Sequence, residues 1–169
     1  NMQIIENLAL ASRRGAHRGL GPGVKHKEKE HYQELLKSLD LGLEDRLTSK
    51  VGLLSGGQRQ AITLLMATMC KPKLLLLDEH TAALDPKTAK KVLDLTEKIV
   101  AENNLTTIMI THNMKDAIAI GNRLIMMNDG KIIYDVEGDE KKALTTADLL
   151  AKFKLTSGEE LDDDKILLS

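Results

Sequence analysis

The sequence predicts an α/β fold in which a helical part precedes half of a parallel β-sheet with its crossover helices. Three observations indicate this fold. Apolar runs alternate with helical patterns after residue 73, an Asn-Asp-Gly turn separates the last two runs, and the earlier residues show helical spacing. We therefore expect a helical subdomain at residues 1–72, a sheet-bearing part at residues 73–155 and an acidic tail at residues 156–169.

The first part predicts three helices. Residues 2–14 favour a helix that leads into a segment rich in Arg, Lys and Gly. A second helix, closed by Gly42, is indicated by four residues at helical spacing, namely Tyr32, Leu35, Leu36 and Leu39. A third helix begins at Ser55-Gly56-Gly57 and is apolar nearly all round over residues 61–69, so we expect it to be buried.

The second part predicts strands and helices in alternation. Strands are expected at residues 74–77, 106–110 and 123–127, with a return strand at residues 131–136. The turn Asn128-Asp129-Gly130 suits a type I′ hairpin, because both central positions of that turn need a positive φ. Helices are expected at residues 87–102, after a cap at Asn113 as far as Gly121, and from a cap at Thr146 to Phe153. The first of these helices places on its inner face Val92, Leu95, Thr96, Ile99 and Val100.

Composition and charge exclude several classes of protein. The 169 residues are 42% hydrophobic and 29% charged, which is the balance of a globular protein rather than a disordered one. A formal net charge of -1 argues against a dedicated nucleic-acid binder. The uncharged run at residues 61–70 is far shorter than the roughly 20 residues that cross a bilayer. Cys70 is the sole cysteine, so no disulfide framework can form within the chain. We therefore expect a soluble protein of a reducing compartment, most simply the cytosol. Because Asn1 precedes Met2, we expect it to be cut from a longer one.

Two carboxylates follow the first apolar strand. Asp78 and Glu79 come directly after residues 74–77, which places them at the carboxyl edge of a parallel sheet, where α/β proteins bind ligands. One carboxylate at such an edge can hold Mg²⁺, and its neighbour can orient a water molecule. The alternative is a buried strand that ends in a solvated acidic turn.

A serine and two glycines precede the third helix. Gly56 and Gly57 can bring backbone N–H groups close to an anion, and the N-terminus of a helix favours phosphate. Ser55 adds a hydroxyl donor to this group. The alternative is a glycine turn in which Ser55 is an ordinary N-cap.

Four motifs in this order resemble those of the ATP-binding-cassette (ABC) ATPases over roughly residues 1–150. Leu-Ser-Gly-Gly-Gln at residues 54–58 ends 20 residues before Asp78, and it is similar to the signature motif. The run that ends in Asp78 and Glu79 resembles the Walker B motif, Ala83-Leu84-Asp85 the D-loop, and Thr111-His112 the switch histidine. The resemblance implies a P-loop NTPase-type parallel sheet, of which this chain holds the second half, joined to the ABC helical subdomain.

The resemblance assigns roles to eight residues, three of them around the reacting phosphate. Asp78 would coordinate Mg²⁺, Glu79 would polarise the attacking water, and His112 would sense the γ-phosphate of ATP. The alternative for His112 is a histidine at a strand end with local hydrogen bonds.

The other five residues would act between two subunits. Ser55, Gly56 and Gly57 would contact the γ-phosphate of ATP held by the opposite subunit, and Gln58 belongs to the same motif. Asp85 would link the two nucleotide sites across a dimer. The alternative for Asp85 is a cap for the helix that begins at Pro86.

The sequence departs from the family pattern at two points. His80 stands after Glu79 where the family usually has proline, as in a bacterial subgroup that serves binding-protein-dependent importers. We interpret His80 as a tolerated loop substitution, and the alternative is a catalytic role. The phosphate loop G-x-x-x-x-G-K-[ST] is missing, since the sole Gly-Lys pair, Gly130-Lys131, is followed by Ile132. The resemblance also implies that a strand belonging between residues 106–110 and 123–127 lies outside this sequence. We therefore expect the parent protein, not this chain alone, to hydrolyse ATP.

The function implied is that of the ATP-hydrolysing subunit of an ABC transporter, in particular a bacterial importer of small solutes or amino acids. Its expected cofactors are ATP and Mg²⁺. Its expected partners are a second ATPase subunit in a head-to-tail dimer, transmembrane permease subunits and, indirectly, an extracytoplasmic binding protein, without nucleic acid. Its expected location is the cytoplasmic face of the plasma membrane. The alternatives are an ABC ATPase that acts outside transport and a non-catalytic regulatory module.

Overall fold

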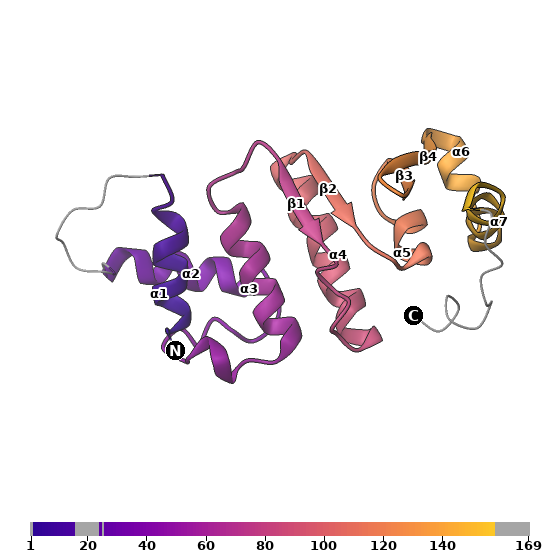
Figure 1. Cartoon of the computed structure of the whole chain (residues 1–169). Coiled ribbons are helices and arrows are strands. Elements are labelled where there is room, and N and C mark those ends of the chain that lie inside the picture. Colours follow the sequence, from indigo (N-terminus) through magenta and orange to yellow (C-terminus); the bar gives the residue numbers. More distant parts are fainter. Residues whose placement is uncertain (1, 16–23, 25, 158–169) are drawn as a thin grey trace. The chain divides into compact units, whose positions relative to one another are not determined.

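Three helices form where apolar residues recur at helical spacing in the first part of the chain. The computed structural model describes residues 2–15, 24 and 26–157, and it places here α1 (Ile4–Ser12), α2 (His26–Lys37) and α3 (Gly56–Thr68) (Figure 1). The chain divides into two compact units, residues 1–110 and 111–169, and each is considered by itself. The boundaries proposed at residues 72 and 155 remain predictions.

Helix α1 is fastened to a distant segment by backbone hydrogen bonds. Gln3 forms an isolated antiparallel bridge with Lys50, the Ile4 amide donates to the Ser49 carbonyl at 3.0 Å, and the Ile5 amide donates to the Leu47 carbonyl at 3.0 Å. A short 3₁₀ turn, η1 (Val51–Leu53), follows this junction and leads toward α3. The two ends of residues 2–51 are therefore held side by side.

The apolar faces of these helices form one core. Its members include fully buried side chains from α1, α2 and α3, among them Ile4, Leu8, Tyr32, Leu36 and Ile62. The expectation that α3 is buried nearly all round was too broad, because Thr63 is exposed and Met66 is half-buried. The expectation that Gly42 closes α2 was also wrong, since α2 ends at Lys37 and turns follow.

A pair of parallel strands follows α3. Strand β1 (Leu75–Asp78) pairs with β2 (Thr107–Ile110), so that Leu75 lies opposite Thr107 and Asp78 lies opposite Ile110. The long helix α4 (Pro86–Asn103) connects the two strands and lies along one face of the pair (Figure 1). This is the crossover arrangement that the alternating pattern predicted.

The β1–β2 pair is covered on one face only, among the residues that the structure describes. Leu75 and Leu77 belong to the same core as Leu95 and Ile99 of α4. The opposite face exposes four large apolar side chains, Leu74, Leu76, Ile108 and Ile110, with Leu76 66% exposed. The prediction of a fully buried strand at residues 74–77 is therefore wrong for alternate residues, because no described element packs on that face.

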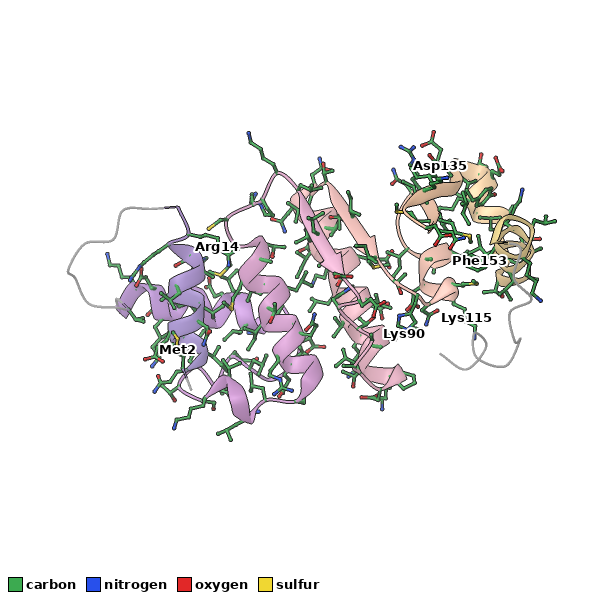
Figure 2. The ribbon with its side chains drawn as sticks, viewed as in Figure 1. Met2, Arg14, Lys90, Lys115, Asp135 and Phe153 are labelled. Atoms are coloured by element: carbon green, nitrogen blue, oxygen red, sulfur yellow. The ribbon has the colours of Figure 1, made fainter. Side chains whose placement is uncertain are left out.

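The second unit is built on an antiparallel hairpin. Strand β3 (Arg123–Asn128) pairs with β4 (Lys131–Glu137), and the positive φ of Asp129 (49°) and Gly130 (72°) confirms the predicted turn chemistry. Asp135, labelled in Figure 2, receives two hydrogen bonds from Arg123, at 2.8 and 2.6 Å. This contact raises the pKa of Arg123 and lowers the pKa of Asp135. Within the described residues β3 pairs with β4 alone.

Three helices pack around this hairpin, α5 (Met114–Ala119), α6 (Gly138–Ala143) and α7 (Thr146–Ser157). The predicted cap of α5 is confirmed, because the Asn113 side chain accepts from the Lys115 amide at 2.9 Å. The predicted cap of α7 is wrong by one residue: the Thr145 hydroxyl, not that of Thr146, accepts from the Asp148 amide at 3.2 Å. Asp148 in turn accepts from the Thr145 hydroxyl at 2.6 Å and from the Thr145 amide at 2.8 Å, and these hydrogen bonds lower the pKa of Asp148.

Some expectations fall outside the described structure. The loop at residues 15–23 is described only at its first residue, and the acidic residues of the tail lie beyond residue 157. Across the described ranges, no helix combines the length and the apolar character that a crossing of the bilayer requires.

The exposed face of the β1–β2 pair predicts that the 169-residue chain associates with itself, because contiguous exposed apolar side chains recruit other apolar surfaces. Changing Leu76, Ile108 and Ile110 together to Thr keeps strand propensity and removes the apolar surface. We expect this variant to have a lower mass than the unmodified chain in size-exclusion chromatography with light scattering. Leu53→Thr, at a residue 73% exposed but outside the sheet, is the control and should leave the mass unchanged. An unmodified chain that is strictly monomeric would contradict the prediction.

Candidate functional site

The start of α3 is held by a reciprocal cap. The Ser55 hydroxyl accepts from the Gln58 amide at 3.2 Å, and the Gln58 side-chain oxygen accepts from the Ser55 amide at 3.2 Å. The Gln58 side-chain nitrogen also donates to the Leu41 carbonyl at 3.2 Å. The N-cap alternative for Ser55 is therefore observed, and Gln58 has a structural reason to be present in its motif. A capping hydroxyl still carries a hydrogen that it can donate to a ligand.

Gly57 of this motif lies against the beginning of α4, and Gly56 lies against Leu84, two residues before that helix. A Cβ atom on Gly57 would lie 2.2 Å from Cγ2 of Thr88, and one on Gly56 would lie 2.9 Å from Cδ2 of Leu84. At Gly57 the neighbouring methyl group belongs to a β-branched side chain of α4, so glycine allows the two helix starts to approach closely. Packing against α4 thus gives Gly57 a structural reason before any ligand is considered.

A cavity of about 430 Å³ opens beside this contact. It is lined by Ser55, Gly57 and Gln58 at the start of α3, by residues 38–41, and by one side of α4 that includes Thr88, Lys91 and Lys98. Amide groups in the first turn of a helix have no partner within the helix, so the start of α3 offers donors here. The ammonium group of Lys98 donates to the Ser38 carbonyl at 3.4 Å, across the cavity wall.

Asp85 caps α4. One of its carboxylate oxygens accepts from the Thr88 amide at 3.0 Å, and Pro86 occupies the first turn, as the cap alternative implied. Hydrogen bonds from Thr88 lower the pKa of the Asp85 carboxyl, which is exposed. Its proposed role across a dimer would be additional to this cap.

Asp78 and Glu79 lie at the carboxyl end of β1, as predicted, and both are exposed. The backbone of Glu79 has a φ of 42°, in the left-handed region that non-glycine residues occupy only when their surroundings hold them there. Its amide donates to the Ile110 carbonyl at 3.0 Å, and its carbonyl accepts from the Ala82 amide at 3.1 Å. The chain therefore turns sharply at Glu79, directly after the strand.

The donor set at this edge fits Mg²⁺ that arrives with a nucleotide. Within the described ranges, no three His, Cys, Asp or Glu side chains gather closely enough to form a metal cage. Mg²⁺ does not require one, because it is commonly held by one or two carboxylates while phosphate oxygens and water complete its shell. The exposed carboxylate of Asp78 supplies a ligand of this kind.

One contact at this edge was not predicted. The imidazole Nε2 of His80 lies 3.1 Å from the hydroxyl of Thr96 on α4. Thr96 is a polar residue on the expected inner face of α4, but nothing in the sequence indicates that its hydroxyl meets His80. The interpretation of His80 as a tolerated loop substitution did not include this contact.

His112 belongs to the second unit and is exposed. It stands between β2 and the cap of α5, where the Asn113 amide donates to the Thr111 hydroxyl at 3.1 Å. The structure thus brings Ser55, Gly56 and Gly57 against the helix that Asp85 caps, and it places Asp78 and Glu79 at one sheet edge within the same unit.

Comparison with known proteins adds independent findings. The sequence model of the family described as "ABC transporter" matches residues 1–82. The tyrosine transport ATP-binding protein of Clostridioides difficile (strain R20291) is 47% identical over 154 residues, which are 91% of this chain and 61% of that protein. The methionine import ATP-binding protein MetN of Streptococcus pneumoniae serotype 4 is 38% identical over 136 residues, which are 78% of this chain and 38% of that protein.

A solved structure shares the fold. It is the dimeric post-hydrolysis state of the ATP-binding cassette MJ0796 bound to ADP and phosphate, with a TM-score of 0.63 and 30% identity over 80% of this chain and 56% of that one. The likeness confirms the α/β fold class expected from the sequence. This chain spans less than two thirds of the length of each of these proteins.

The contact between Gly57 and Thr88 predicts a specific stability defect. Gly57→Ala should lower the free energy of unfolding by about 1–3 kcal/mol, since the added methyl group overpacks the contact. Thr88→Ser removes the Cγ2 atom that the new methyl group would meet, so it should restore part of the loss in the double variant. Urea unfolding of the four proteins measures this coupling. Gly52→Ala is the control, because an added methyl group there would have nothing within 4 Å. Strictly additive effects would contradict the prediction.

Proposed function

We infer that this chain is a member of the family of ABC transporter ATP-binding proteins, because its sequence and motifs resemble theirs. The proposed function follows from that premise. We propose that the protein it represents hydrolyses ATP and drives a transporter. The observation that carries the proposal is the exposed Asp78-Glu79 pair at the carboxyl end of β1, held in a left-handed turn beside β2. An exposed carboxylate at that edge can hold a cation, and its neighbour can accept a hydrogen bond from water.

Two residues of this edge would act at the reacting phosphate. Mg²⁺ bound with ATP supplies charge stabilisation for phosphoryl transfer to water. Asp78 would hold that ion directly or through a water molecule. The Glu79 carboxylate would accept a hydrogen bond from the attacking water and so orient it, and His112 would contact the γ-phosphate.

The start of α3 would serve the nucleotide of a second copy of the protein. Its amides at Gly56 and Gly57, together with the Ser55 hydroxyl, are hydrogen-bond donors at the positive end of a helix and suit a phosphate. Gln58 would support them through the reciprocal cap with Ser55. Asp85 would face the partner across a head-to-tail dimer. The dimeric cassette among the similar structures supports this arrangement.

We further propose that the transporter imports an amino acid. Two similar proteins support this, one named for tyrosine transport and the other for methionine import. The expected partners are transmembrane permease subunits and, through them, an extracytoplasmic binding protein that selects the solute. The ATPase would then work on the cytoplasmic face of the plasma membrane.

Glu79→Gln in the complete protein is the experiment that tests the proposal. The amide keeps the size of the side chain but lacks the negative charge and cannot take up a proton from the attacking water, so turnover should fall by about 100-fold or more. Binding of ATP should be retained, because Glu79 is not assigned a contact with the nucleotide. Phosphate release and the binding of a fluorescent ATP analogue measure the two quantities separately.

Glu97→Gln, at an exposed residue of α4, is the matched control and should leave turnover unchanged. The 169-residue chain by itself should show no turnover, because it contains no G-x-x-x-x-G-K-[ST] loop to hold the triphosphate. The proposal fails if the Glu79→Gln protein hydrolyses ATP at the unmodified rate.

A further inference from the structure

The side chain of His80 connects the turn at Glu79 to the interior of α4. Its Nε2 atom lies 3.1 Å from the Thr96 hydroxyl, and Thr96 is only 3% exposed. His80 itself is half-buried, and it is joined directly to Glu79 through the backbone. The connection spans 16 residues of sequence, so it links two separate elements of the fold rather than one local turn.

The chemistry of Thr96 fixes the direction of this hydrogen bond. The Thr96 hydroxyl lies 2.8 Å from the Val92 carbonyl, one helical turn earlier, and donates to it. A hydroxyl has a single hydrogen but two lone pairs, so toward His80 it acts as the acceptor. The hydrogen between the two side chains therefore belongs to Nε2 of His80.

The backbone at Glu79 needs several anchors to keep its left-handed conformation. Two of them are backbone hydrogen bonds, from the Glu79 amide to Ile110 on β2 and from the Ala82 amide to the Glu79 carbonyl. The hydrogen bond from His80 to α4 adds an anchor in a different direction, from an element that packs in the core.

We propose that His80 is a positioning residue, which holds the turn at Glu79 against Thr96 of α4 so that the Glu79 carboxylate keeps one orientation toward the attacking water. This inference rests on the proposed role of Glu79 in ATP hydrolysis. A positioning residue of this kind affects the chemical step, because a small displacement of a catalytic group lowers its effectiveness steeply. It leaves binding of ATP almost unchanged, since neither His80 nor Thr96 is assigned a contact with nucleotide.

Steady-state kinetics of the complete ATPase test the proposal through kcat and KM. In His80→Ala and in Thr96→Val, kcat should fall about tenfold, while KM for ATP should change by less than about twofold. The double variant should be no slower than the slower single variant, because both changes remove the same hydrogen bond. Thr96→Ser keeps the hydroxyl and should retain kcat close to that of the unmodified protein.

A matched control separates positioning from general loosening of the fold. Thr68 on α3 is also buried, at 5% exposure, and its hydroxyl also donates to the carbonyl one turn earlier, Leu64, at 2.9 Å. Thr68→Val removes an equivalent helix contact in a residue that has no part in the site. It should lower the melting temperature about as much as Thr96→Val but leave kcat unchanged. Equal losses of kcat in both variants would overturn the proposal.

A second measurement reads the hydrogen bond without catalysis. Nuclear magnetic resonance of ¹⁵N-histidine-labelled complete protein should show His80 as the Nε2–H tautomer, assigned by its disappearance in His80→Ala. Thr96→Val should alter that signal, and Thr96→Ser should preserve it. An Nδ1–H tautomer, or unchanged kcat in His80→Ala, overturns the inference while leaving the proposed function intact. Absence of ATP hydrolysis in the unmodified protein overturns both, even if the tautomer is the one expected.

Discussion

The close approach of Gly57 to Thr88 is the contact on which the first unit depends. It sets the start of α3 directly on the start of α4, where no side chain larger than hydrogen fits. Because α4 also covers one face of the β1–β2 pair, the position of α3 relative to the strands follows from this contact. The cap at Ser55 and the carboxylates at the end of β1 are therefore both positioned by packing against α4.

Local chemistry made much of this fold predictable. Ser55, Asp85 and Asn113 cap helices because their short side chains reach amides two or three residues on, and such a reach is visible in sequence. The cap of α7 was placed one residue late because Thr145 and Thr146 are both suitable, and only Asp148 distinguishes them. Helix α6 escaped prediction because its sequence, Gly-Asp-Glu-Lys-Lys-Ala, carries no apolar repeat. Lys141 of α6 is buried, and its ammonium group donates to the Ile118 carbonyl of α5, which ties the two helices together.

Other features depend on which elements meet, and sequence does not state that. Leu76 lies in an unbroken apolar run, which predicts a place in the core, yet it is exposed because no described element covers its face of the sheet. The candidate site is likewise only partly predictable from the sequence. Its motifs identify Ser55 to Gln58, Asp78, Glu79, Asp85 and His112 by residue type and order, but the structural reason for Gly57 is its closeness to Thr88 on another helix. The pairing of His80 with Thr96 is likewise a product of packing, between residues that no periodic pattern connects.

The junction between α1 and residues 47–51 bears on how this part of the chain can diverge among relatives. Its hydrogen bonds fix both ends of the intervening stretch, and α2 within that stretch packs in the same core as α1. The entropy of closing a flexible loop grows only with the logarithm of its length, and a doubling costs roughly 0.6 kcal/mol. Insertions and deletions between α1 and α2 should therefore accumulate in homologous lineages with little penalty, whereas a single deletion between Lys50 and Ser55 would shorten the direct link from this junction to the start of α3.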